Sequence, residues 1–185
     1  MFLKATVEDN IKIALELQPG REDEDLNAEA SRLLDDLGMG SLARQQAFSL
    51  SGGERRRLEI CRALTLRPKF LLLDEPFTGI DPLTIIDLQR ILIMLRDRGI
   101  GILISDHNVR DTFRIVRRAY VIDDGEILVE DEPRAIVRNA KARERFLGSD
   151  FRMAEEVGPA NETTDGRPES LPENRGRGKS KPLQG

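Results

Sequence analysis

The sequence predicts an α/β fold with a parallel sheet, and three observations support this prediction. Residues 70–73 and 101–105 are short apolar runs, and an apolar run without alternation is typical of a parallel strand covered on both faces. Residues 83–98 lie between them and carry apolar residues at helical spacing. A helix that joins two such strands indicates parallel strands in an α/β arrangement. With 185 residues, 39% of them hydrophobic, the chain has room for one such domain and an appendage.

The part of the chain before the first strand predicts helices. Residues 7–17 and 26–37 have apolar residues at spacings of three and four with acidic residues between them, which predicts two amphipathic helices. A Pro-Gly pair separates the two. A third helix is expected to begin at Ser51 and to end before Pro68.

The part after the second strand predicts shorter elements. We expect a helix over residues 109–116, a closing hairpin of residues 119–123 and 126–129 around an Asp-Gly turn, and a helical region over residues 133–147. From residue 154 the composition changes to Glu, Gly, Pro, Asn, Arg and Ser. This change predicts a disordered tail over residues 154–185.

Composition argues against several kinds of function. The longest apolar runs fall far short of the roughly 18 residues that a membrane-spanning helix needs, so we expect any membrane role to come through a partner. The net charge of −4, with 34% charged residues of mixed sign, argues against binding of nucleic acid. The single cysteine, Cys61, leaves no intramolecular disulfide, and we expect no signal peptide. The expected location is a reducing cytoplasm.

Two acidic residues directly follow the first predicted strand. Asp74 and Glu75 would lie at the carboxyl end of that strand, where open α/β sheets bind ligands. Asp74 is expected to hold Mg²⁺, directly or through water. Glu75 is expected to orient and partly deprotonate an attacking water molecule. The alternative is an ordinary strand that ends in two solvent-exposed acids.

A second candidate site is the segment of Ser51, Gly52, Gly53 and Glu54 at the start of the third helix. The first N–H groups of a helix and its dipole suit an anion, and glycines let the backbone approach a phosphate closely. The same residues also match a capping box, with Ser51 as the N-cap and Glu54 three positions later. The two roles are compatible.

Two single residues complete the candidate set. His107 is the only histidine and lies just beyond the second predicted strand, where it could reach a terminal phosphate. Its alternative is an ordinary surface-loop residue. Asp81 precedes Pro82, which is typical of the N-cap of the next helix. The functional alternative is that Asp81 lies at a subunit contact beside the site.

In this order and spacing, the motifs resemble those of ABC transporter nucleotide-binding subunits. Residues 50–54 resemble the ABC signature, residues 70–75 resemble Walker B with its catalytic glutamate, residues 78–81 resemble the D-loop, and His107 resembles the switch histidine. The resemblance covers residues 2–153. Short matches favour the ATPases of lipopolysaccharide export, and branched-chain amino-acid transporter ATPases are the nearest alternative.

The resemblance implies roles for the same residues. Glu75 and His107 are expected to be catalytic, and Asp74 is expected to bind the metal. The signature residues are expected to contact the nucleotide of a second subunit, and Asp81 to lie at the dimer contact. The implied ligands are ATP and Mg²⁺. The implied partners are a second ABC ATPase subunit, in a two-fold dimer, and integral membrane transporter subunits that hold the ATPase at the cytoplasmic side of the inner membrane.

The phosphate-binding motif of the family is not found in the sequence. A P-loop needs Gly, four residues, then Gly-Lys-Ser/Thr, and the Gly-Lys-Ser at Gly178 has Glu173 where the first Gly is required. The Q-loop glutamine of the family pattern is also not found in the sequence. We therefore expect the C-terminal part of a P-loop ABC ATPase domain, inactive alone, with an exposed hydrophobic sheet edge. A non-catalytic interaction module is the alternative.

The expected organisation follows from this resemblance. Residues 1–153 are expected to form a partial nucleotide-binding domain. Within it, residues 7–66 would be a helical subdomain, and residues 67–153 would be a sheet core that carries Walker B and the switch histidine.

Overall fold

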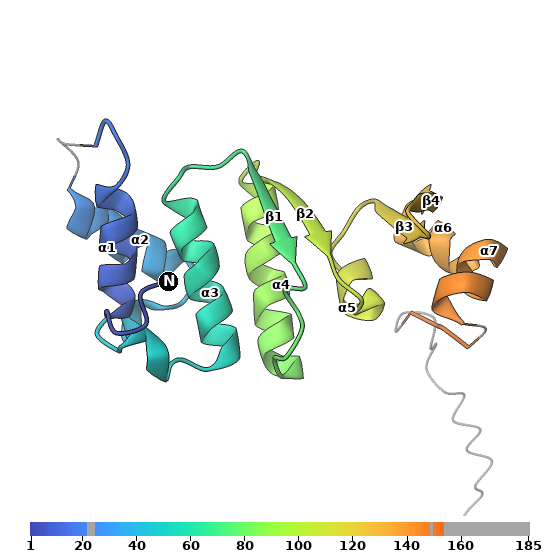
Figure 1. Ribbon diagram of the computed structural model, residues 1–185, viewed down its shortest axis with the longest axis horizontal. Helices are drawn as coiled ribbons and strands as arrows, with labels where there is room; N and C mark the ends of the chain where they lie inside the picture. Colours follow the sequence, from blue (N-terminus) through green and yellow to red (C-terminus); the bar gives the residue numbers. More distant parts are fainter. Residues whose placement is uncertain (22–24, 149, 154–185) are drawn as a thin grey trace, which may run out of the picture. The chain divides into compact units, whose positions relative to one another are not determined.

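The structure is a computed structural model that describes residues 1–21, 25–148 and 150–153. Residues Met1–Phe151 form one compact unit. The tail expected to be disordered, residues 154–185, lies outside the described residues. Figure 1 shows the helices and strands in chain order: α1 (Val7–Glu16), α2 (Leu26–Asp36), η1 (Gly40–Leu42), η2 (Ala47–Ser49), α3 (Gly52–Leu64), β1 (Phe70–Asp74), α4 (Pro82–Asp97), β2 (Gly101–Ser105), α5 (Val109–Phe113), β3 (Ala119–Asp123), β4 (Glu126–Asp131), α6 (Pro133–Arg138), α7 (Ala140–Ala142) and η3 (Arg143–Leu147).

The three helices that precede β1 begin where the sequence predicts. Thr6 caps α1 and Ser51 caps α3, each in a reciprocal capping box, and Asp25 caps α2 through two backbone N–H groups. The apolar stripe of α1 is buried at Val7, Ile11 and Leu15. Contacts of α1 with both α2 and α3 form the first part of the core, in which each fully buried aliphatic side chain contributes about 2 kcal/mol.

The first two strands form the parallel pair that the sequence predicts. β1 and β2 pair in parallel, from Phe70 opposite Gly101 to Asp74 opposite Ser105. The crossover between them contains α4, which lies alongside the strands (Figure 1) and buries Leu88, Leu92 and Leu95. Because the two strands are parallel, their carboxyl ends meet at one edge, and this edge positions the candidate site.

The strands are not covered on both faces, and here the prediction from apolar runs was wrong for the described residues. Leu71 faces the core at 5% exposure, whereas Phe70, Leu72 and Leu103 are 70%, 75% and 61% exposed. Successive side chains of a strand point to opposite faces, so the exposed residues share the face away from α4. The apolar sequences of β1 and β2 indicate that side chains on both faces of the strands are suited to burial. In the described part of the chain, only one face is packed.

The elements after β2 differ from those predicted from the sequence mainly in their lengths. β3 and β4 form the expected antiparallel hairpin, and its turn residues, Asp124 and Gly125, have φ values of 48° and 81°, as a two-residue hairpin loop requires. The helix predicted over residues 109–116 ends at Phe113. The helical region predicted over residues 133–147 is interrupted at Asn139, which has extended backbone and caps α7. Among the described helices, none is long and apolar enough to cross a membrane.

Candidate functional site

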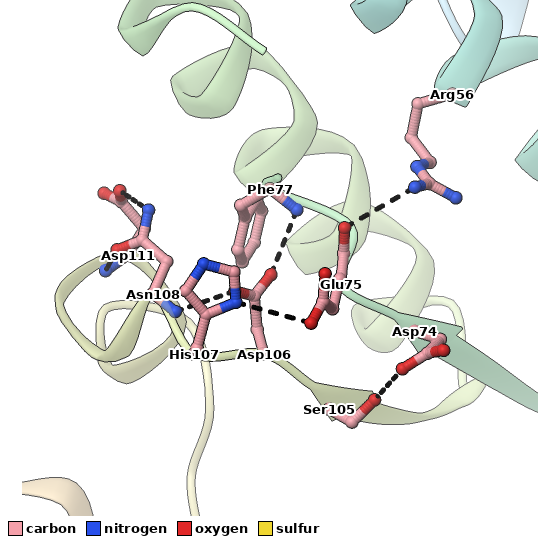
Figure 2. A network of polar contacts seen from close by, with 9 residues as sticks. All are labelled: Arg56, Asp74, Glu75, Phe77, Ser105, Asp106, His107, Asn108 and Asp111. Carbon is pink, nitrogen blue, oxygen red and sulfur yellow. Dashed lines mark hydrogen bonds and ion pairs between the residues drawn. The ribbon is translucent and has the colours of Figure 1, made fainter. Parts of the chain in front are cut away.

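The candidate site lies at the carboxyl ends of β1 and β2, which the parallel register places side by side. Asp74 and Ser105 are the last paired residues, and the Ser105 hydroxyl donates a hydrogen bond to Asp74 Oδ1 at 2.5 Å. The Glu75 N–H donates to the Ser105 carbonyl oxygen at 2.7 Å, which extends the ladder one residue beyond β1. Figure 2 shows both acidic side chains beside the end of β2.

Glu75 has a backbone conformation that is unfavourable for its residue type. Its φ is +44°, in the left-handed region that costs a residue with a side chain about 1–3 kcal/mol. Its carbonyl accepts hydrogen bonds from the Thr78 N–H at 3.2 Å and from Arg56 Nη2 at 3.5 Å. Surrounding contacts therefore hold Glu75 at a turn where the chain leaves the strand. Strain of this kind concentrates at functional sites.

His107 faces Glu75 from the loop after β2. Its Nδ1 lies 3.4 Å from Glu75 Oε1, and the two side chains are 70% and 54% exposed. The same nitrogen lies 3.9 Å from Asp106 Oδ1. At this exposure the direct attraction between the imidazole and the carboxylate is weak, about 0–1 kcal/mol. The pair is thus open to a ligand and to water (Figure 2).

Asp74 is suited to coordinate a magnesium ion whose other ligands are nucleotide phosphate oxygens and water. Mg²⁺ commonly takes one or two carboxylates and completes its octahedron with water and phosphate oxygens. The exposed carboxylate of Asp74, beside the Ser105 hydroxyl, fits that pattern. Within the described ranges, no group of three or more His, Cys, Asp or Glu residues forms a complete metal site. The donor set is therefore suited to a shared ion and not to a metal held by protein alone.

The second candidate region, Ser51 to Glu54, forms the predicted capping box at the start of α3. Glu54 N–H donates to Ser51 Oγ at 3.3 Å, and Ser51 N–H donates to Glu54 Oε2 at 2.8 Å. The backbone hydrogen bond from Ser51 is the main cause that lowers the pKa of Glu54, and the charge of Arg57 adds to it. The Glu54 carboxylate is thus engaged in the cap, so anion binding here rests on the other three residues.

The two glycines of this segment differ in what surrounds them. A Cβ added to Gly53 would lie 2.0 Å from Thr84 Cγ2, which is a clash with the first turn of α4. A Cβ added to Gly52 would lie 3.5 Å from the Gly79 carbonyl oxygen and from Ile80 Cγ2, which is ordinary contact. Close packing of α3 on α4 therefore explains Gly53. Packing does not require Gly52, which is exposed.

Asp81 caps α4, as the sequence predicts for one of its two interpretations. Its Oδ1 accepts the Thr84 N–H at 3.0 Å and its Oδ2 accepts the Thr84 hydroxyl at 2.5 Å. These hydrogen bonds lower the pKa of Asp81, the hydroxyl bond contributing most. Pro82 occupies the first turn. The side chain is exposed, which leaves a contact with another subunit as a proposal.

The structure places the predicted site residues in two groups. Asp74, Glu75 and His107 lie together at the strand ends, whereas Ser51 to Glu54 lie at the start of α3, next to the loop before Asp81. Arg56 on α3 connects the groups through its contact with the Glu75 carbonyl. The sequence motifs did not single out Arg56 or Ser105. Both residues lie within short sequence matches to the family, but no role was predicted for either of them.

The chain is similar to known ABC transporter ATP-binding proteins. A family model described as "ABC transporter" matches residues 1–78. The lipopolysaccharide export system ATP-binding protein LptB of Escherichia coli (strain K12) is 41% identical over 153 residues, which are 83% of this chain and 64% of that protein. An ABC transporter ATP-binding protein of Rhizobium meliloti (strain 1021), described as uncharacterized, is 47% identical over 156 residues, which are 83% of this chain and 56% of that protein. The chain thus spans less than two thirds of the length of either relative.

Solved structures give the same result for the fold. An ATP-binding cassette of an ABC transporter, determined in an ADP conformation, matches with a TM-score of 0.70 and 27% identity over 80% of this chain and 64% of that one. The α/β arrangement with a parallel sheet is therefore that of an ABC cassette.

Proposed function

Because the chain belongs to the ABC transporter family of ATP-binding proteins, we propose that it supplies the signature, Walker B and switch parts of a transporter ATPase. The observation that supports this most is the pair of Glu75 and His107, 3.4 Å apart at the ends of two parallel strands. A strained, exposed carboxylate beside an exposed imidazole has no evident use in stabilising the fold. It suits a site where water attacks a phosphate.

In this proposal Glu75 acts on water and His107 acts on the phosphate. The Glu75 carboxylate accepts a hydrogen bond from the attacking water molecule and draws its proton. The His107 ring donates a hydrogen bond to the terminal phosphate, where charge develops as the bond to that phosphate breaks. Asp74 would hold Mg²⁺, directly or through water, and the bound ion would supply positive charge beside the phosphates. Because Glu75 and His107 are close together and both exposed, the two side chains can contact the same ligand.

The start of α3 binds the nucleotide of a second subunit in the same proposal. Ser51 and the N–H groups of Gly52 and Gly53 begin a helix of 13 residues, whose positive dipole end suits a γ-phosphate. Gly52 is the residue of this segment that packing leaves unexplained. Asp81, exposed at the neighbouring loop, contacts the partner subunit. Such a dimer would use the same surface on both subunits.

The transported substrate is proposed to be lipopolysaccharide. The support is the 41% identity to LptB of Escherichia coli, together with the short motif matches. The partners are then integral membrane transporter subunits, and the chain works at the cytoplasmic side of the inner membrane. Depletion of the protein in its native cell should leave lipopolysaccharide in the inner membrane, as membrane fractionation would measure. Normal lipopolysaccharide export with lost uptake of branched-chain amino acids would favour the alternative transporter class instead.

The catalytic part of the proposal is tested by Glu75→Gln. The assay uses the ATPase complex isolated from the native cell, because residues 1–185 contain no P-loop motif of their own. Loss of the base should lower ATP turnover by about 10²-fold or more, while ATP binding is retained, since the neutral side chain keeps its shape. Glu126→Gln on the exposed hairpin end is the matched control and should leave turnover unchanged. Unchanged turnover in Glu75→Gln would contradict the assignment.

A second candidate function is a non-catalytic module that pairs with an intact ATPase. In this function the P-loop would come from the partner, because no P-loop motif is found within the 185 residues. This alternative predicts that the chain associates with an ABC ATPase and that Glu75→Gln changes neither the association nor the turnover of the complex. Co-purification combined with the turnover assay separates the two functions.

A further inference from the structure

Asp106 lies between the two loops that carry Glu75 and His107, and its side chain is fully buried. Its Oδ2 accepts a hydrogen bond from the Phe77 N–H at 3.1 Å. Its Oδ1 accepts one from the Asn108 N–H at 2.7 Å. Figure 2 shows the carboxylate reaching from the end of β2 toward the backbone that follows Glu75. One side chain therefore bonds both loops of the candidate site.

Each of the two hydrogen bonds fixes a different loop. The bond to Asn108 spans two residues and closes a turn with His107 at its centre, a local arrangement that Asp favours. The bond to Phe77 joins positions 29 residues apart. Phe77 is itself anchored in the core at 2% exposure. Asp106 thus ties the His107 turn to the fixed point just after Glu75.

The contacts of Glu75 and His107 themselves do not fix their separation. Both side chains are more than half exposed, so packing does not hold them, and their direct attraction is screened by solvent. The backbone positions of the two loops therefore set the distance. A buried carboxylate that accepts two backbone N–H groups is a strong and directional connection.

We propose that Asp106 is a positioning residue that holds His107 and Glu75 at the mutual distance required for ATP hydrolysis. This inference rests on the proposed function, because it gives Asp106 its role through those two residues. A merely structural role would lower stability without any dependence on His107. The distinction can be measured.

Amide hydrogen exchange of the 185-residue chain tests the connection without any activity assay. Asp106→Ala should speed exchange of the Phe77 and Asn108 amides, about tenfold or more, because each loses a charged acceptor. Asp106→Asn keeps one acceptor oxygen and should leave one of the two amides protected. This variant provides the test if Asp106→Ala does not fold. Asp25→Ala is the matched control, since Asp25 likewise accepts two backbone N–H groups, those of Asn27 and Ala28. It should change exchange there and not at Phe77.

Turnover of the native ATPase complex tests the role. Asp106→Ala should lower kcat about a hundredfold, with the KM for ATP changed much less, and Asp106→Asn should lie between it and the wild type. In a His107→Ala background the further loss from Asp106→Ala should be clearly smaller, because the distance between His107 and Glu75 no longer matters once the ring is absent. Asp25→Ala should leave kcat unchanged.

Two results would overturn the inference. One is wild-type turnover in Asp106→Ala in a complex that Glu75→Gln inactivates. The other is equal loss from Asp106→Ala with and without His107. If Glu75→Gln itself leaves turnover unchanged, the proposed function fails instead, and unchanged exchange at Phe77 and Asn108 would still reject the connection.

Discussion

The start of α3 and the ends of β1 and β2 carry the two groups of candidate residues, and they differ in what the fold gains from them. At the start of α3, Ser51 and Glu54 cap the helix, and Gly53 permits close packing on α4. At the strand ends, Glu75 is held at a φ of +44° and His107 is largely exposed. Ser51, Gly53 and Glu54 thus stabilise the fold, whereas the conformation of Glu75 costs free energy of folding and His107 contributes little.

This difference separates residues that the fold explains from residues that it does not. A residue type required by packing or capping would be retained without any ligand. Glu75, His107 and Gly52 have no such requirement among the described contacts. These are the residues at which a functional explanation is most needed.

Replacement of His107 should have a large effect that is confined to activity. We expect His107→Ala to lower ATP turnover of the native complex about 10²-fold, because one positioned donor to the developing phosphate charge is lost. The free energy of unfolding of the chain should change by less than about 0.5 kcal/mol, since the side chain is exposed. Urea titration and turnover together measure this. A large loss of stability with normal turnover would reverse the comparison.

The two glycines of α3 should separate stability from binding. Gly53→Ala should lower the free energy of unfolding by about 1–3 kcal/mol, because its Cβ would overlap Thr84. Gly52→Ala should change it by less than about 0.5 kcal/mol. If the segment binds a phosphate, Gly52→Ala should nevertheless weaken ATP-dependent dimer formation, which sedimentation would measure. Equal stability losses at both positions would show that packing requires both glycines.

The Glu54 cap should give a smaller, pH-dependent effect. Its pKa is lowered in the folded chain by the Ser51 backbone hydrogen bond. The resulting stability is present above the unfolded value, about 4.3 for Glu, and is lost as pH falls through the lower folded value. The difference in unfolding free energy between the chain and Glu54→Gln should therefore shrink below about pH 4. A difference that stays constant down to pH 2.5 would contradict the cap as its source.

Local signals predicted the elements well, and long-range contacts were not predictable. The capping box at Ser51 and the Asp-Gly turn of the hairpin act within a few residues, so the sequence shows both directly. The exposure of Leu72 and Leu103 depends on which segments cover the sheet. An apolar strand sequence predicts that the side chains are suited to burial, but it does not show which segment packs against them.

The candidate site was predicted in part for the same reason. Asp74, Glu75 and His107 were recognisable because strand ends and family motifs mark them. The bond from Phe77 to Asp106 joins residues far apart in the sequence and leaves no local pattern. The positive φ of Glu75 was also hidden, because a glutamate gives no signal for a conformation that glycine prefers.

The central claim is that the fold holds Glu75 in a strained conformation because its carboxylate is needed for function. Glu75→Gly tests this most directly, with unfolding free energy and ATP turnover measured on the same variant. Glycine adopts a positive φ without strain, so we predict that stability rises by about 1 kcal/mol while turnover falls at least 10²-fold. A variant that is less stable, or one that hydrolyses ATP as fast as the wild type, would contradict the claim.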